Sequence, residues 1–131
     1  MPIYRKNGKS VLFIHIPKAA GTTIDHGFLR AGWTVGLQDG GGRPDTILPH
    51  LLCSFQHFHA ALLSSMLRIG SFDAIFAVMR DPMTRLESEY RWRRKHSKAP
   101  LPDFERWTIQ QFDDFGRNPF ILGNHIRPQA E

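Results

Sequence analysis

Two short apolar runs, each followed by a proline, constrain the fold of this 131-residue chain more than any other feature. The first is VLFIHI at 11–16, which Pro17 ends. The second is the nearly all-apolar FDAIFAVM at 72–79, which Arg80-Asp81-Pro82 ends. Continuous apolar character over a short run is typical of a strand with both faces covered. We therefore expect two buried strands in one sheet.

The rest of the chain favours helices between and after these strands. Thr22 and Thr23 are suited to cap the first helix, Gly32 to end it, Pro82 to begin the third helix and Asp103 to cap the fourth. The expected elements are helices over 22–30, 55–69, 82–96 and 103–112, a short strand over 33–37, and a loop over 38–49. Residues 118–131 show no clear pattern. This alternation predicts an α/β fold, with a P-loop-like, mainly parallel sheet flanked by helices in a single compact domain spanning 1–131.

Composition narrows the choice of partner and compartment. The formal net charge of +5 favours an anionic partner, which leaves a nucleotide, a nucleic acid, an acidic glycan and a membrane surface open. Cys53 is the only cysteine, so no intrachain disulfide forms, and a reducing compartment fits. No segment approaches the ~20 apolar residues of a membrane span. We expect a soluble, cytoplasmic protein without a membrane span.

A candidate anion site follows the first strand, where IPKAAGTT at 16–23 leads into a helix. The first amides of a helix lack partners within it, and the helix dipole adds positive potential there. Small residues allow an oxyanion to approach the backbone, a lysine adds charge, and threonines add donors. The candidate residues are Lys18, Ala19, Ala20, Gly21, Thr22 and Thr23. The lysine precedes the glycine, which disfavours a Walker A loop; an ordinary strand-to-helix turn is the alternative.

A second candidate site follows the second strand. Arg80 stands at its carboxyl end, where a guanidinium can bind a phosphate in a forked geometry. Ser88 lies eight residues on, on the next helix, and Arg85 shares a face with it. The alternative is an ion pair between Arg80 and Asp81 beside a surface helix. Ligands of α/β sheets bind at the carboxyl ends of strands, so we expect both motifs to face one site.

Together the two motifs resemble the sulfotransferase superfamily, most closely its carbohydrate branch, which includes the heparan sulfate 2-O-sulfotransferases. In that family PKxxGTT binds the 5′-phosphosulfate of 3′-phosphoadenosine-5′-phosphosulfate (PAPS), and RDPxxRxxSxY binds its 3′-phosphate. Residues 17–23 and 80–90 match these motifs. A third segment, GNHIRPQ at 123–129, resembles the signature DNHxRPQ, with Gly123 in place of the aspartate. The matches span nearly the whole chain.

The resemblance implies a PAPS-dependent sulfotransferase that moves a sulfuryl group to an acceptor hydroxyl, with 3′-phosphoadenosine 5′-phosphate (PAP) as product and no metal. It implies that Lys18 stabilises charge near the bridging oxygen, that the 5′-phosphate lies on the Gly-Thr-Thr segment, and that Arg80 and Ser88 bind the 3′-phosphate. A carbohydrate acceptor is implied by the branch alone, and lipid, alcohol and phenol acceptors stay open.

The resemblance also implies a histidine base between the two motifs. His57 and His59 are the candidates, with His59 favoured by position and His57 second. The ordinary imidazole pKa of about 6.5 suits proton acceptance at neutral pH. Packing or capping of the helix is the alternative for either ring. We expect His125 to line the acceptor site and Arg127 to meet an acidic sugar.

Relatives of this branch continue beyond the third signature, so the chain is expected to be short at its C-terminal end. A compact minimal enzyme, a fragment and a donor-binding relative without efficient turnover all fit that expectation. Two rival functions stay open. One is a kinase-like P-loop protein that uses Asp81 as a metal-binding acid, and the other is a nucleic-acid module built on the basic run at 91–95.

Overall fold

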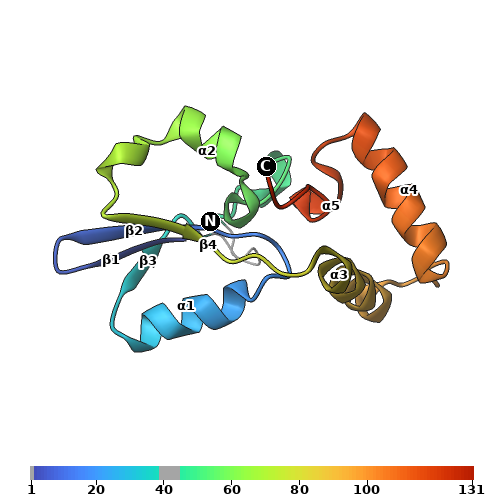
Figure 1. Cartoon of the computed structure of the whole chain (residues 1–131), viewed down its shortest axis with the longest axis horizontal. Coiled ribbons are helices and arrows are strands. Elements are labelled where there is room, and N and C mark those ends of the chain that lie inside the picture. Colours follow the sequence, from blue (N-terminus) through green and yellow to red (C-terminus); the bar gives the residue numbers. More distant parts are fainter. Residues whose placement is uncertain (1, 39–44) are drawn as a thin grey trace.

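The computed structural model describes residues 2–38 and 45–131, which form a mixed α/β fold around a four-stranded sheet. The strand order is β3-β1-β2-β4. In Figure 1, α1 lies on one face of the sheet and α2 on the other, while α3, α4 and α5 lie beyond the strand ends. The strands are β1 (Ile3–Lys6), β2 (Lys9–Ile14), β3 (Thr34–Gly36) and β4 (Ala74–Ala77). The α-helices are α1 (Gly21–Arg30), α2 (Ala60–Met66), α3 (Pro82–His96), α4 (Phe104–Arg117) and α5 (Ile121–Asn124).

The prediction of a mainly parallel sheet is wrong. Strand β1 pairs antiparallel with both β2 and β3, and only β2 and β4 are parallel. The difference arises at Asn7 and Gly8, whose φ angles of 50° and 78° make a two-residue turn between β1 and β2. Asn-Gly is the strongest short-range signal for such a hairpin, because both positions need a positive φ. The N-terminal residues therefore form a strand rather than a polar lead-in.

The one parallel pair is the pair that carries the two motifs. Ile14 at the end of β2 is level with Ala77 at the end of β4. Both motifs therefore start at the same edge of the sheet. Strand β2 is buried on both faces, as predicted, since Leu12 and Phe13 are both inaccessible to solvent. The same expectation is wrong for β4, where Ile75 is 41% exposed, because β4 lies at the edge of the described sheet.

Alternation along β1 and β2 builds a core on each face of the sheet. Leu12 packs with Ile3, Phe58 and Leu63 on the α2 side. On the α1 side Phe28 stacks on Tyr4, with ring centroids 3.8 Å apart. Phe13 likewise stacks on Phe76 at 4.8 Å. A separate core joins α3 and α4 to the C-terminal segment through Leu86, Trp107 and Ile126.

Most of the remaining predicted elements are confirmed, with corrections to the end of α4, to the N-cap of α1 and to the helix predicted over 55–69. Helix α3 has the predicted bounds, and Asp81 caps it by accepting from the Thr84 N–H at 2.9 Å. Helix α4 extends past the predicted residue 112 to Arg117. Helix α1 has Ala20 at its N-cap without a side-chain bond, so neither threonine caps it. Residues 39–44 of the predicted loop lie outside the described residues.

The single helix predicted over 55–69 is wrong as well. Short 3-10 helices occupy Phe55–His57 and Ile69–Ser71, and α2 covers only the middle. Phe58 and His59, which lie between the first of these 3-10 helices and α2, have extended backbone. This break lets Phe58 enter the core beside Leu12. Core burial therefore overrides the helical spacing of apolar residues in this segment. A further 3-10 turn covers Leu48–His50.

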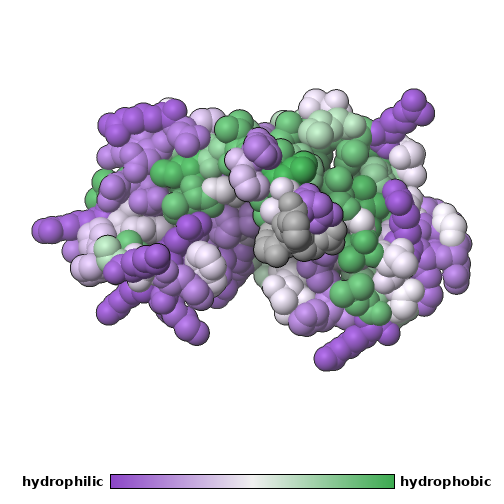
Figure 2. Space-filling view, turned by 180° about the vertical axis from the view of Figure 1, so that it is seen from behind, coloured by the Kyte–Doolittle hydropathy of each residue, from purple (hydrophilic) through white to green (hydrophobic). Residues whose placement is uncertain are grey.

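Polar side chains dominate much of the outer surface. Seen from behind, both ends of the molecule are largely hydrophilic, and apolar side chains gather toward the middle (Figure 2). Within 2–38 and 45–131, no helix has the length and apolar character needed to cross a membrane.

Leu12 gives a test of the core between the sheet and α2. Leu12→Ala should lower the free energy of unfolding by about 2–5 kcal/mol, because it leaves a cavity among buried side chains. Leu52→Ala is the matched control, since Leu52 is 74% exposed, and its effect should stay within about 0.5 kcal/mol. Urea denaturation of both variants measures the difference, and equal effects would contradict the described core.

Candidate functional site

A cavity of about 450 Å³ lies where β2 and β4 end. Residues from both predicted motifs and from the loop before α2 line this cavity. From the first motif come Lys18, Ala20, Gly21 and Thr22; from the second come Arg80 and Ser88. His57 and His125 line the same cavity. The structure thus brings together residues that stand more than 100 positions apart in the sequence.

The loop from β2 to α1 has an unusual backbone. Lys18 and Ala20 both have φ of 66°, a left-handed conformation that costs a residue with a side chain of order 1–3 kcal/mol. The Ala19 N–H donates to the Ile16 carbonyl at 3.2 Å, and α1 begins at Gly21. Left-handed residues next to a helix start turn successive amides toward one point and make a concave anion site. The amides of Gly21 and Thr22, which open α1, add to it, whereas those of Thr23 and Ile24 donate to the Ala20 carbonyl.

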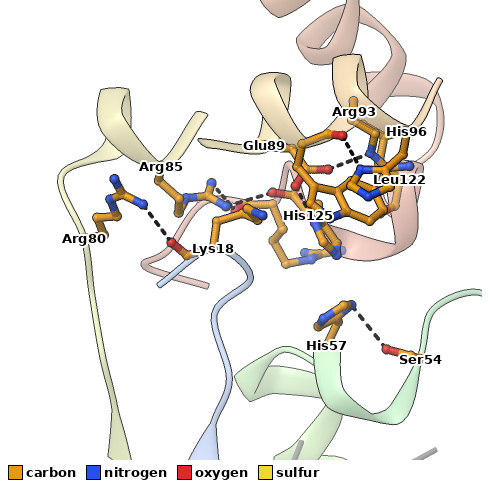
Figure 3. A network of polar contacts seen from close by, with 12 residues as sticks. Lys18, Ser54, His57, Arg80, Arg85, Glu89, Arg93, His96, Leu122 and His125 are labelled. Atoms are coloured by element: carbon orange, nitrogen blue, oxygen red, sulfur yellow. Dashed lines mark hydrogen bonds and ion pairs between the residues drawn. The ribbon is translucent and has the colours of Figure 1, made fainter. Parts of the chain in front are cut away.

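Arg80 lies directly beside this loop. Its Nη1 donates to the Lys18 carbonyl at 3.3 Å (Figure 3). Its Nε donates to Thr84 Oγ1 at 3.2 Å. Asp81 caps α3 instead of pairing with Arg80, so the ion-pair alternative does not hold. Gln129 fixes the Arg80 backbone from both sides, accepting from its N–H at 3.0 Å and donating to its carbonyl at 2.8 Å.

The GNHIRPQ segment holds the cavity together from the C-terminal side. Buried Arg85 donates from Nη1 to the His125 carbonyl at 2.7 Å and from Nη2 to the Arg127 carbonyl at 3.1 Å. Asn124 donates to the His57 carbonyl at 2.6 Å. Arg85, expected to share the cavity face of α3 with Ser88, therefore clamps backbone instead. The segment ties α3 and the His57 loop to one another.

Three histidine rings form a row at the cavity. The His15 and His57 ring centroids are 5.4 Å apart, and those of His57 and His125 are 4.5 Å apart at nearly right angles. Burial, together with neighbouring positive charges, lowers the pKa of His15 to about 4. Burial and the neighbouring His125 and His15 lower the pKa of His57 to about 3. His15 and His57 are therefore neutral at pH 7.

Glu89 stands behind His125 and is fully buried. Its Oε2 accepts from His125 Nδ1 at 2.8 Å, and its Oε1 accepts from Arg93 Nε at 2.7 Å (Figure 3). Burial alone would raise the pKa of this carboxyl, but the hydrogen bonds and charges of His125 and Arg93 hold it below its usual value. Glu89 is a buried anion with two donors in place.

Four predicted site residues do not line this cavity. Ala19 is buried, and Thr23 lines a shallow pocket with Phe28 and Trp33. His59 and Arg127 line a neighbouring cavity of about 140 Å³. Arg127 is engaged within its own segment, because it donates to Asn124 Oδ1 at 2.7 Å, to Glu131 Oε2 at 2.6 Å and to the Pro119 carbonyl at 3.0 Å.

Sequence reasoning missed three residues at the site and gave His15 only a weaker claim. His15, Gln56 and Trp92 line the cavity, and Glu89 supports it. The Lys18 ammonium lies 5.6 Å from the centroid of the Trp92 ring, a cation–π distance. A signal for Glu89 existed, since Arg93 follows it at i+4. Its link to His125, 36 residues away, had no signal in the sequence.

No protein-family model, curated protein or solved structure matches this chain. Among the described residues, no group of three histidine, cysteine, aspartate or glutamate side chains is arranged to hold a metal ion. What the site offers chemically is a cationic cavity with a concave backbone, two neutral histidines and a histidine paired with a buried carboxylate.

Gly21 gives a test of the close packing at the cavity floor. A Cβ built on Gly21 would lie 1.9 Å from His15 Nε2, so Gly21→Ala must displace the half-buried imidazole. We expect a loss of about 1–3 kcal/mol in the free energy of unfolding. Gly27→Ala is the matched control in the same helix, where a Cβ meets nothing within 4 Å. It should stabilise by up to about 1 kcal/mol. Equal free energies of unfolding for the two variants in chemical denaturation would contradict the close packing of Gly21 against His15.

The two depressed histidine pKa values predict a pH dependence of stability. The unfolded chain binds protons near the ordinary value of 6.5, whereas folded His15 and His57 resist protonation down to about 4 and 3. Stability should therefore be full above pH 6.5 and fall as the pH is lowered, by up to about 1.4 kcal/mol for each pKa unit. Urea denaturation between pH 7 and 5 measures the slope. His57→Gln should flatten it, and exposed His26→Gln should leave it unchanged.

Proposed function

We propose that this chain is a PAPS-dependent sulfotransferase, which moves a sulfuryl group from PAPS to the hydroxyl of a carbohydrate. The observation that carries the proposal is the shared cavity: Lys18 from one strand tip and Arg80 with Ser88 from the other line the same space. A donor with phosphates at opposite ends of one adenosine calls for two such anion sites. The β2-loop-α1 unit is the P-loop-like part of the fold in this proposal.

In this proposal the two ends of the donor have separate partners. The 5′-phosphosulfate lies against the α1 amides and Lys18, and the 3′-phosphate lies against Arg80 and Ser88. The positive φ of Lys18 and Ala20 supports the first assignment, because it turns backbone amides into a concave surface. The second assignment is supported by Gln129, which holds the Arg80 backbone in place.

The reaction is an in-line displacement at sulfur. The acceptor oxygen forms a bond to sulfur, the bond from sulfur to the bridging oxygen breaks, and PAP leaves with that electron pair. Lys18 and the helix amides stabilise the growing charge on the leaving phosphate. The hydroxyl proton passes to a histidine. The geometry favours His57 over His59 for contact with the cavity, since only His57 lines it.

The acceptor class and the compartment belong to the proposal too. The carbohydrate acceptor rests on the motif resemblance. A reducing compartment such as the cytoplasm fits Cys53, which is a buried free thiol. We propose no resident metal, because displacement at sulfur needs only positioned cations, amides and a base.

Calorimetric titration with PAP, without added metal, tests the proposal. PAP should bind the wild-type chain more tightly than ATP or AMP, which have no 3′-phosphate. Lys18→Ala and Arg80→Ala should each weaken PAP binding at least about tenfold, since each removes a charged partner of a phosphate. Arg94→Ala is the matched control: it also removes one positive charge, from an exposed position on α3 outside the cavity lining, and should have little effect.

Two results would overturn this function. Magnesium-dependent binding of ATP in preference to PAP would indicate a kinase-like protein. Equal loss of PAP affinity in Arg94→Ala and Lys18→Ala would indicate non-specific attraction to a basic surface, as expected of a nucleic-acid module. Circular dichroism of each variant shows whether the fold is kept.

A further inference from the structure

Resting on the proposed function, we propose that His125 is the general base of the reaction and that the buried carboxylate of Glu89 positions it. The hydrogen bond between His125 Nδ1 and Glu89 Oε2 is 2.8 Å long. The Glu89 side chain is 1% exposed, whereas that of His125 is 16% exposed and lines the cavity. One edge of the imidazole therefore meets a buried anion while the ring stays accessible from the cavity.

The carboxylate determines which nitrogen of His125 is available. An ionised carboxylate only accepts hydrogen bonds, so Nδ1 must carry the proton that joins it to Glu89. The lone pair of the neutral ring is then at Nε2, on the edge away from Glu89. Arg93 occupies the other carboxylate oxygen and keeps Glu89 anionic. The pair has the arrangement that nucleophilic enzymes use to orient a histidine base.

The backbone of His125 is held as firmly as its ring. Its carbonyl accepts from Arg85 Nη1 at 2.7 Å, and the preceding residue, Asn124, donates to the His57 carbonyl. The ring is thus oriented before any acceptor arrives. Orientation of this kind lowers the entropic cost of reaching the transition state.

His57 and His15 are less suited than His125 to act as the general base. His57 Nδ1 is engaged with Ser54 Oγ at 3.2 Å, and the low pKa of His57 makes it a weak base at neutral pH. The His15 ring packs against that of His57, and within residues 2–38 and 45–131 its buried Nδ1 has no hydrogen-bond partner. The charged and titratable groups around His125 are Glu89, Arg93 and Arg85 from α3, His57 from the 3-10 turn and, one ring further, His15.

In the proposed step, His125 Nε2 takes the acceptor proton as the oxygen–sulfur bond forms and the bond from sulfur to the bridging oxygen breaks. The ring becomes an imidazolium beside the Glu89 carboxylate, which stabilises the new positive charge. The proton then passes to solvent after the products leave. His57, packed edge-on against His125 at 4.5 Å, is a positioning residue in this scheme.

Histidine ¹⁵N NMR of the full chain tests the pair without an acceptor. Neutral His125 should show the Nδ1–H tautomer, and Glu89→Gln should lose that preference while exposed His26 stays unchanged. A wild-type His125 in the Nε2–H tautomer would overturn the proposal. This measurement needs only the wild-type protein, so it decides the matter even if Glu89→Gln fails to fold.

Turnover of ³⁵S-labelled PAPS tests the catalytic role, with N-sulfated heparosan fragments in one arm and water alone in the other. His125→Gln should lower kcat by about 100-fold or more, the usual contribution of a general base, with the Kd for PAP unchanged. His57→Gln should lose less, and His26→Gln is the matched control on the surface of α1.

The outcomes separate this inference from the proposed function. If the wild type binds and turns over PAPS but His125→Gln keeps full turnover, the inference alone fails. If the wild type does not bind PAP, or binds it and turns over no donor in either arm, the proposed function fails and the base assignment fails with it.

Discussion

The arrangement of the site depends on one buried guanidinium. Arg85 lies inside the contact between α3 and the C-terminal segment and donates to the carbonyls of His125 and Arg127. Burial lowers the pKa of the guanidinium, and the nearby Glu89 carboxylate opposes that effect. A buried cation is stable only where good acceptors surround it, so the segment cannot move away without leaving the charge unpaired.

The same segment links parts of the chain that share little else. Asn124 bonds to the His57 carbonyl, His125 bonds to Glu89, and Gln129 pairs with both backbone groups of Arg80. Each bond joins a different wall of the cavity to the same seven residues, 123–129. The signature that the sequence offers as a sign of the acceptor site is, in the structure, first of all the support for the second motif and for the loop that carries His57.

Local sequence signals were enough to predict several elements of the fold. The apolar runs located β2 and β4, and the pattern that follows the second run gave the bounds of α3 correctly, because a continuous apolar run and a proline suited to a helix start are strong local signals. Two misses have tertiary causes: Phe58 leaves the helical pattern to fill the core, and Glu89 meets a partner 36 residues away. The hairpin at Asn7 was a different miss, since its turn signal was present in the sequence.

The neutral state of His15 and His57 has a consequence for how the cavity handles charge. Neither ring contributes positive potential near pH 7, so attraction for an anion comes from Lys18, Arg80 and the backbone amides. Lowering the pH from 7 to 5 therefore leaves both rings largely uncharged, and the positive potential of the cavity does not draw on them over that range.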